Sequence, residues 1–415
     1  MPALILYRRL AKRLFLFGVA AIVCLVPLVK YRNRNQQQPD AYAIMERQEA
    51  AASSNGHLTS NVVPIDPQAV NIVYVACGEQ QIDDMFVSIK SILLLTNSPE
   101  ITFIVFTNLH SSLEQIRHRF TELVTSKALA RLSGSIVDIY PVDLEFPSVH
   151  HSNLNVDISW RNTDTKCKMQ KMFLPAVIED FEAIIYLDTA TIVMRPIEEL
   201  WVEFFRMREP EMLSMVLDVE PSETSVLKKE DELDTKTLSN GPGVLLMNLT
   251  KMRNFEWEEK LMHTLHQHHI HLGNANPQNI LDTMVQIARK EMRLLSCQWN
   301  FRPFYCKKAK GGCDSASLKG FALVNGNSGL FHQGNGIFSH IYSIFKNFDP
   351  HQMDIFENFL KPMKKTLKTG DFALEHCSIV FSALATYMDD SITRLYGAAE
   401  SFAMKGYYSQ QHEDI

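Results

Sequence analysis

Short apolar runs alternate with segments of helical spacing over most of the chain. The runs have the length and the content of branched and aromatic side chains that buried strands have. They lie at residues 71–77, 101–107, 136–141, 183–187 and 243–247. Apolar residues recur at helical spacing in segments 82–95, 113–132 and 168–178. This alternation predicts an α/β fold with a parallel sheet covered by helices.

The two ends of the chain depart from this pattern. Residues 31–70 are polar and show no clear period, which is typical of a flexible stem. After residue 350 the strand pattern stops, and residues 351–405 have the spacing of two amphipathic helices that are split near 369–371.

One apolar segment has the character of a membrane anchor. Leu14–Val29 holds 16 residues without a charge, with four basic residues before it and three after it. As a helix it spans about 24 Å, and flanking Lys and Arg side chains can extend this reach. We expect a cytoplasmic tail at 1–13, a type II signal anchor at 14–29 and a stem at 30–70. A cleaved signal peptide is the alternative, but the small-x-small cleavage pattern is absent.

Composition and charge narrow the function classes. The 415 residues are 46% hydrophobic and 21% charged, which excludes a disordered or collagen-like chain. The net charge is −6, yet residues 1–34 carry seven basic residues and no acidic one, so the remainder is strongly acidic. An acidic body argues against a nucleic-acid binder.

The cysteines fit an oxidising compartment. Of seven, Cys24 lies in the predicted anchor and six lie in the body. An even number permits three disulfides with 15 possible pairings, and Cys306 with Cys313 could close a small loop. Irregular spacing and the absence of a C-x-x-C pair argue against zinc.

The most informative segment is residues 183–196, where an apolar strand ends at Asp188. In open α/β sheets ligands bind beyond the carboxyl ends of strands. An aspartate there can hold a divalent cation or a sugar hydroxyl, or it can simply cap a turn. This segment alone leaves both alternatives open.

Several segments together resemble glycosyltransferase family 8, and most closely its glucoside xylosyltransferases. The most specific is C-Q-W-N-F-R-P at residues 297–303, followed by Cys306 and Cys313. The other similar segments are V-A-C-G-E at 75–79, Q-K-M-F-L-P at 170–175, G-V-L-L-M-N-L-T-K-M-R at 243–253 and the glycine-rich loop around Gly326, Gly329 and His332.

The resemblance implies a GT-A type fold at 71–350, with a mixed, mostly parallel sheet, a C-terminal helical extension at 351–415 and a UDP-sugar as donor. It assigns the uridine to the backbone of Val75, Ala76, Cys77 and Gly78, and the diphosphate to Lys171. Asp188 would touch Mn²⁺ or ribose, and Asn325 and Gly326 would complete the donor site. Family members retain the anomeric configuration of the sugar.

Four departures from the family bear on activity. Ala190 stands where the second metal aspartate is expected, and Asn325 stands in place of a histidine ligand. Residues 273–276 hold Asn274 and Asn276, our candidate catalytic residues, where the family has Gly-Asp-Gln-Asp. Gly241-Pro242-Gly243 replaces an Asn-Ser-Gly pattern. An amide binds Mn²⁺ less well than a carboxylate or an imidazole, so we expect a weakened or lost metal site.

Three further features have competing interpretations. Trp299, with Asn300, could contact an acceptor sugar or lie in the core. Asn248 begins an N-glycosylation sequon directly after an apolar strand. The histidine-rich run at 263–271 has no acidic or cysteine partner at fixed spacing, which favours a solvated helix end over a metal site.

The sequence therefore predicts a Golgi or endoplasmic reticulum enzyme with its body in the lumen. Its partners would be a UDP-sugar donor, a glycan or glycoprotein acceptor and the membrane, and not a nucleic acid. The alternative is a catalytically impaired family member that acts as a binding partner or chaperone for another transferase.

Overall fold

The computed structural model describes residues 65–146, 163–216, 243–267, 277–307, 312–326, 329–333, 336–369 and 377–410. The predicted tail and anchor, and the stem up to residue 64, lie outside these residues. Among the helices that are described, none combines the length and the apolar character needed to cross a membrane.

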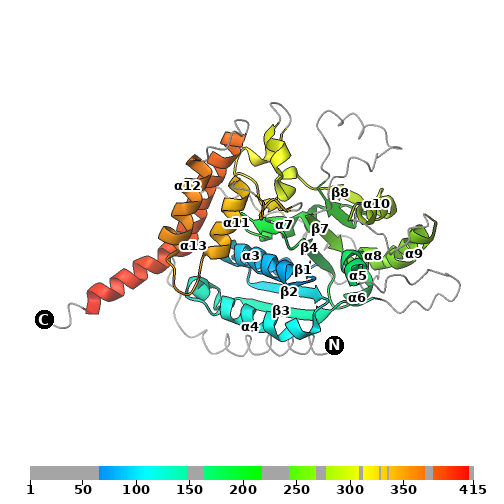
Figure 1. Cartoon of the computed structure of the whole chain (residues 1–415), viewed down its shortest axis with the longest axis horizontal. Coiled ribbons are helices and arrows are strands. Elements are labelled where there is room, and N and C mark those ends of the chain that lie inside the picture. The colour runs from blue at the N-terminus through cyan, green and yellow to red at the C-terminus, as the bar shows by residue number, and fades with distance from the viewer. Residues whose placement is uncertain are drawn as a thin grey trace, which may run out of the picture. The chain divides into compact units, whose positions relative to one another are not determined.

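A seven-stranded sheet lies at the centre of the described part, with the order β3-β2-β1-β4-β7-β6-β8 (Figure 1). Its strands are β1 Ala69–Val75, β2 Glu100–Thr107, β3 Ile136–Asp143, β4 Ala183–Leu187, β6 Leu213–Met215, β7 Val244–Asn248 and β8 Met292–Leu294. The strands β1 to β4 run parallel to one another, whereas β7 is antiparallel to both β4 and β6. The predicted α/β class and the mixed, mostly parallel sheet are confirmed.

The strand sequences explain this order. Every residue of β1, β2 and β4 is buried, as expected for continuous apolar runs covered on both faces. The strand β3 is only half-buried and carries Pro141. Proline cannot donate a ladder hydrogen bond, and it is tolerated here because β3 is the edge strand.

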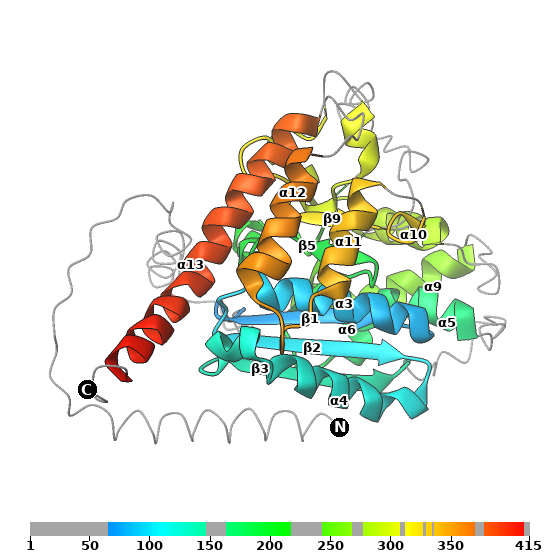
Figure 2. The same ribbon diagram turned by 60° about the vertical axis from the view of Figure 1, so that its left-hand side comes forward.

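Helices cover both faces of this sheet (Figure 2). They are α3 Glu79–Leu95, α4 Leu113–Val124, α5 Thr163–Met169, α6 Leu174–Val177, α7 Glu198–Trp201, α8 Leu249–Asn254, α9 Trp257–Gln267, α10 Pro277–Ala288, α11 Ile337–Asn347, α12 Lys361–Thr369 and α13 Ser378–Gln410. Shorter turns are η1 His110–Ser112, η2 Lys127–Leu132, η4 Gln170–Met172, η5 Val202–Arg206, η10 Cys297–Asn300, η11 Pro303–Lys307, η12 Asp314–Ala316 and the π-helical η14 Phe356–Leu360.

Two predicted helices are interrupted. The helix expected at 168–178 consists of α5, η4 and α6, because the ring of Pro175 in α6 would clash with the Lys171 carbonyl of a continuous helix. The helix expected at 113–132 ends at Val124. The Thr125 hydroxyl then donates to the Thr121 carbonyl, and a 3₁₀ turn follows from Lys127.

The C-terminal helices pack onto the core beside α3. Leu384, Met388 and Ile392 of α13 are fully buried in the same apolar cluster as α3, and the Tyr396 hydroxyl donates to the Leu94 carbonyl at 3.0 Å. The helix α12 ends at Thr369, where the sequence predicted a break. The domain boundary at residue 350 stays a prediction.

Three disulfides join the described residues, as the cysteine count permitted. They are Cys77–Cys167, Cys297–Cys313 and Cys306–Cys377. The prediction that Cys306 and Cys313 could close a small loop is wrong. Cys306 bonds to Cys377 at the start of α13, and Cys313 bonds to Cys297 of η10. Two of the bridges join residues 90 and 71 positions apart, whereas Cys297–Cys313 joins residues 16 apart.

Asn248, the asparagine of the sequon, is the N-cap residue of α8. Its side chain is 7% exposed and accepts a hydrogen bond from the Lys251 backbone N–H at 2.9 Å. It therefore caps the helix in the way that Asn residues commonly do. A glycan on Asn248 would need this cap to open, so glycosylation there stays a prediction.

Two substitutions of Asn248 test its role as a helix cap and its predicted role as a glycosylation site. Asn248→Ala should lower the free energy of unfolding by about 1 kcal/mol, because the Lys251 N–H loses its acceptor. Asn248→Asp removes the sequon as well but keeps an oxygen acceptor, so it should preserve stability in denaturant titration. A fall in intact mass by one glycan in Asn248→Asp would show that the cap is open in the mature protein.

Candidate functional site

The candidate site lies where the strand order of the sheet reverses. The strand β1 has β2 on one side and β4 on the other, so the chain winds in opposite directions from this point. Val73 pairs with Tyr186, which places Val75 level with Asp188 at the carboxyl ends of two parallel strands. Ligands of open α/β sheets bind in the crevice outside such a reversal.

The loop after β1 is held from two sides. The Cys77 N–H donates to Gln81 Oε1 at 2.8 Å, and the Gly78 N–H donates to Asn108 Oδ1 at 3.1 Å. Gly78 has a φ of 88°, which strains any residue with a Cβ atom, and it precedes the first turn of α3. The predicted uridine-binding residues therefore form a fixed turn at the start of a long helix.

Lys171 and Asp188 both contact one tyrosine, Tyr186. Lys171 is 7% exposed, and its Nζ lies 5.4 Å from the centre of the Tyr186 ring. The Tyr186 hydroxyl donates to Asp188 Oδ1 at 2.8 Å. Burial, and then the charge of Asp188, raise the pKa of Tyr186 well above its usual value, so the hydroxyl stays a donor. The sequence predicts the cation and the carboxylate but not the tyrosine that both of them contact.

The segment that carries Lys171 is fixed to the ends of two more strands. The Gln170 side chain accepts from the Glu145 N–H at 3.0 Å and donates to the Glu145 carbonyl at 2.8 Å, just beyond β3. The Trp257 Nε1–H donates to the Met172 carbonyl at 2.8 Å. The loop after β1 holds the same segment through Cys77–Cys167.

A second, two-stranded sheet brings Asn325 and Gly326 to the turn after Asp188. Strand β5, Thr191–Val193, pairs antiparallel with β9, Leu323–Asn325. The Gly326 N–H donates to the Ala190 carbonyl at 2.7 Å. Asn325 and Gly326 therefore lie beside the turn that carries Asp188 and Ala190, the other positions that the resemblance assigns to the metal.

The segment at 243–253 approaches this turn so closely that its first residue must be a glycine. The Asp188 N–H donates to the Gly243 carbonyl at 3.0 Å. A Cβ atom on Gly243 would overlap Asn325 Nδ2 and lie 2.5 Å from Asn300 Oδ1. Any larger residue at 243 would therefore displace the two asparagines.

The residues at the metal positions do not fit a three-ligand Mn²⁺ site. Asp188 offers one carboxylate, which already accepts from Tyr186, and Ala190 offers no side-chain ligand. Asn325 is 2% exposed, and its Nδ2 donates to Asn300 Oδ1 at 3.0 Å. Mn²⁺ in proteins prefers several hard ligands, and one carboxylate with a hydrogen-bonded amide falls short of that.

The acceptor candidates lie inside the described fold. Trp299 is 2% exposed and joins the apolar core, with the Arg195 guanidinium 5.8 Å from its ring centre. Asn300 is 1% exposed and accepts from Asn325. This placement favours the core interpretation of Trp299, and it makes Asn300 a support for Asn325. The catalytic candidates Asn274 and Asn276 lie outside the described residues.

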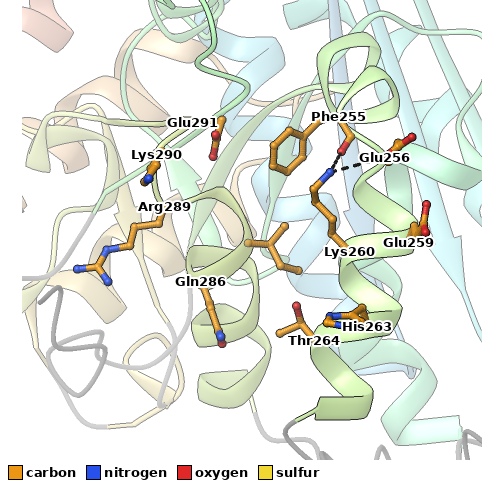
Figure 3. A pocket seen from close by; sticks show the side chains of 11 residues that line it. Phe255, Glu256, Glu259, Lys260, His263, Thr264, Gln286, Arg289, Lys290 and Glu291 are labelled. Carbon is orange, nitrogen blue, oxygen red and sulfur yellow. Dashed lines mark hydrogen bonds and ion pairs between the residues drawn. The ribbon is translucent and has the colours of Figure 1, made fainter. Parts of the chain in front are cut away.

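A pocket of about 590 Å³ lies between α9 and α10, away from these candidates in the sequence (Figure 3). Figure 3 shows the Lys260 side chain turned back to the Phe255 carbonyl, with which it makes a 2.6 Å hydrogen bond. His263 of the histidine-rich run lines this pocket beside Glu259 and Thr264. None of the predicted donor-site residues lines it.

Known proteins resemble this chain over most of the described fold. The chicken glucoside xylosyltransferase 1 is 23% identical over 344 residues, covering 79% of this chain and 74% of that protein. The mouse glucoside xylosyltransferase 2 is 24% identical over 318 residues, covering 72% and 67%. The apo crystal structure of mouse xyloside xylosyltransferase 1 aligns with a TM-score of 0.41 and 15% identity, covering 63% of this chain and 98% of that one.

A family model covers more than half of the chain. The model of glycosyl transferase family 8 matches residues 72–319, from β1 to the turn after Cys313. The matched region contains Lys171, Asp188 and the segment at 243–253. The chain therefore belongs to glycosyl transferase family 8.

Proposed function

We propose that this glycosyltransferase takes a UDP-sugar as donor and transfers its sugar to a glycan on a glycoprotein. The observation that carries the proposal is the Lys171–Tyr186–Asp188 arrangement at the strand reversal between β1 and β4. A cation and a carboxylate at this edge suit the two polar parts of a nucleotide diphosphate.

Each residue then has a distinct part in binding. The turn at 75–78 receives the uridine, and Asp188 accepts a hydrogen bond from a ribose hydroxyl. The Lys171 ammonium faces the diphosphate, whose negative charge grows as the bond to the sugar breaks. Because Lys171 is 7% exposed, little water screens this attraction. Asn325 and Gly326 border the same turn and lie toward the sugar.

The family's divalent cation supplies charge to the leaving diphosphate when it is bound. The side chains of this chain do not offer its usual ligand set, so we assign that charge to Lys171. A cation carried by the nucleotide itself would meet only Asp188. The donor site is therefore expected to bind UDP in the presence of EDTA.

The donor sugar and the acceptor are inferred from the relatives. Proteins named glucoside xylosyltransferases suggest xylose as the sugar and a glucoside as the acceptor. The predicted acceptor residues Trp299 and Asn300 are buried, so the proposal assigns neither of them a direct contact with the acceptor.

We further propose that the body lies in the lumen of the Golgi or endoplasmic reticulum, as a single-pass type II protein. The predicted anchor at 14–29 supports this. The three disulfides support it too, because disulfides persist in oxidising compartments. The alternative, a non-enzymatic partner of another transferase, gains no specific support from the fold.

The direct test is calorimetric UDP binding to the full-length chain in EDTA, followed by turnover of UDP-sugars on glycan acceptors. Binding with turnover supports the transferase. Binding without turnover on any acceptor supports the non-enzymatic partner, and no binding under any condition overturns the donor site.

Lys171 is the first residue to change. Lys171→Met should weaken UDP binding by about 2 kcal/mol, or about thirtyfold in the dissociation constant, because the diphosphate loses a buried cation. Lys168→Met is the matched control, since Lys168 is an exposed lysine one turn earlier in the chain. Equal loss in both variants would assign the effect to net charge and not to Lys171.

Ala190 tests the metal positions. Ala190→Asp adds a second carboxylate near Asp188, so Mn²⁺ should strengthen UDP binding by about tenfold over EDTA in this variant and far less in the wild type. Ala190→Asn adds the same volume without the charge and serves as the control. An unchanged response to Mn²⁺ in Ala190→Asp would mean that 190 is not a ligand position.

A further inference from the structure

The Cys77–Cys167 disulfide joins two parts of the proposed donor site. Cys77 lies in the turn after β1, and Cys167 lies in α5, four residues before Lys171. The two cysteines are 90 residues apart in the sequence. A covalent bond therefore connects the proposed uridine-binding turn to the segment that carries the proposed diphosphate cation.

The segment needs such a connection because its helix is broken. Pro175 prevents a continuous helix through Lys171, so α5, η4 and α6 are short pieces. Short helices are not stable without tertiary contacts. Gln170 is fixed to Glu145 beyond β3, but this contact does not reach β1.

Contacts to three strands of the sheet fix the position of Lys171. The disulfide fixes the segment to β1, Gln170 fixes it to β3, and the Lys171 ammonium lies over the Tyr186 ring of β4. Removing the disulfide leaves the segment held to the end of β3 through Gln170 and to α9 through Trp257, but without its covalent bond to the turn after β1. The ammonium can then shift relative to the turn at 75–78.

We infer that Cys77–Cys167 is a positioning element of the donor site, which holds Lys171 at the correct distance from the nucleotide turn. This inference rests on the proposed function. Displacing a binding group by about 1 Å can cost up to about a hundredfold in a precisely arranged site. The disulfide thus acts on nucleotide affinity through Lys171, in addition to any effect on stability.

A second disulfide provides a matched control. Cys306–Cys377 has a sequence separation of 71, so its removal releases a similar amount of chain entropy. Both of its cysteines are buried, at 1% and 2% exposure, so their replacement disturbs the core at least as much. Neither cysteine lies in the segments assigned to the donor.

The experiment compares Cys77→Ala/Cys167→Ala with Cys306→Ala/Cys377→Ala in the full-length chain. Unfolding and UDP binding in EDTA are measured at a temperature at which each variant is folded. We expect similar losses of stability, but at least about tenfold weaker UDP binding in the first variant alone. Equal UDP affinity in the wild type and the first variant, or equal loss in both variants, overturns the inference.

A double-mutant cycle identifies the route through Lys171. Lys171→Met should cost about thirtyfold in the wild type but only a few-fold without Cys77–Cys167, because the misplaced ammonium contributes little. If Lys171→Met weakens UDP binding by the same factor with and without the disulfide, the two effects are independent. That result contradicts a positioning role of the disulfide. If the wild type does not bind UDP at all, the proposed function itself fails, which is a separate outcome.

A measurement that does not need the nucleotide completes the test. In the wild type, Lys171 is 7% exposed and should react slowly with an amine-acylating reagent. Loss of the disulfide should raise its labelling rate, read by peptide mass, while Lys168 changes little. If the first variant does not fold, wild-type protein that is partly reduced and alkylated replaces it, with mass mapping to identify the opened bond. An unchanged Lys171 rate then overturns the inference.

Discussion

The reversal of strand order at β1 is the constraint on which the rest of the structure depends. It places the carboxyl ends of β1 and β4 side by side, at the edge of the sheet where ligands of open α/β sheets bind. Asp188 can lie beside the turn at 75–78 only because β4 adds to β1 on the side opposite β2. The position of the candidate site is thus a consequence of topology, and side chains determine only what binds there.

The turn after Asp188 is connected to the core by a chain of hydroxyl groups. The Thr191 hydroxyl donates to the Asp188 carbonyl at 2.7 Å and lies 3.1 Å from the Ser88 hydroxyl, which lies 2.8 Å from the Tyr74 hydroxyl. Burial raises the pKa of Tyr74 above its usual value, so it remains a donor and the chain runs in one direction. A fully satisfied buried network of this kind gives the turn a defined geometry.

The sequence predicted the elements better than it predicted their contacts. The range of β4 was correct to the residue, because its five apolar residues stand between turn residues. Apolar residues keep their helical spacing through Pro175, so the spacing alone does not predict the break that this proline causes. The pairing of Cys306 depends on the docking of α13, which no local pattern encodes. Tyr186 was overlooked because its apolar ring fits a buried strand, and its hydroxyl has a partner only through the geometry of Asp188.

Charge distribution links these observations to the chemistry of the site. The chain is acidic overall, and a diphosphate bound to an acidic protein needs local positive charge. Relatives of the family obtain part of it from a metal held by acids. Ala190, at a position that the resemblance assigns to a metal-binding aspartate, carries no charge, which also lowers the repulsion that a diphosphate would meet there. A single buried ammonium then has a larger share of the attraction, and its placement matters more. In the proposed donor site, the contacts that fix Lys171 are therefore as much a part of donor binding as the ammonium itself.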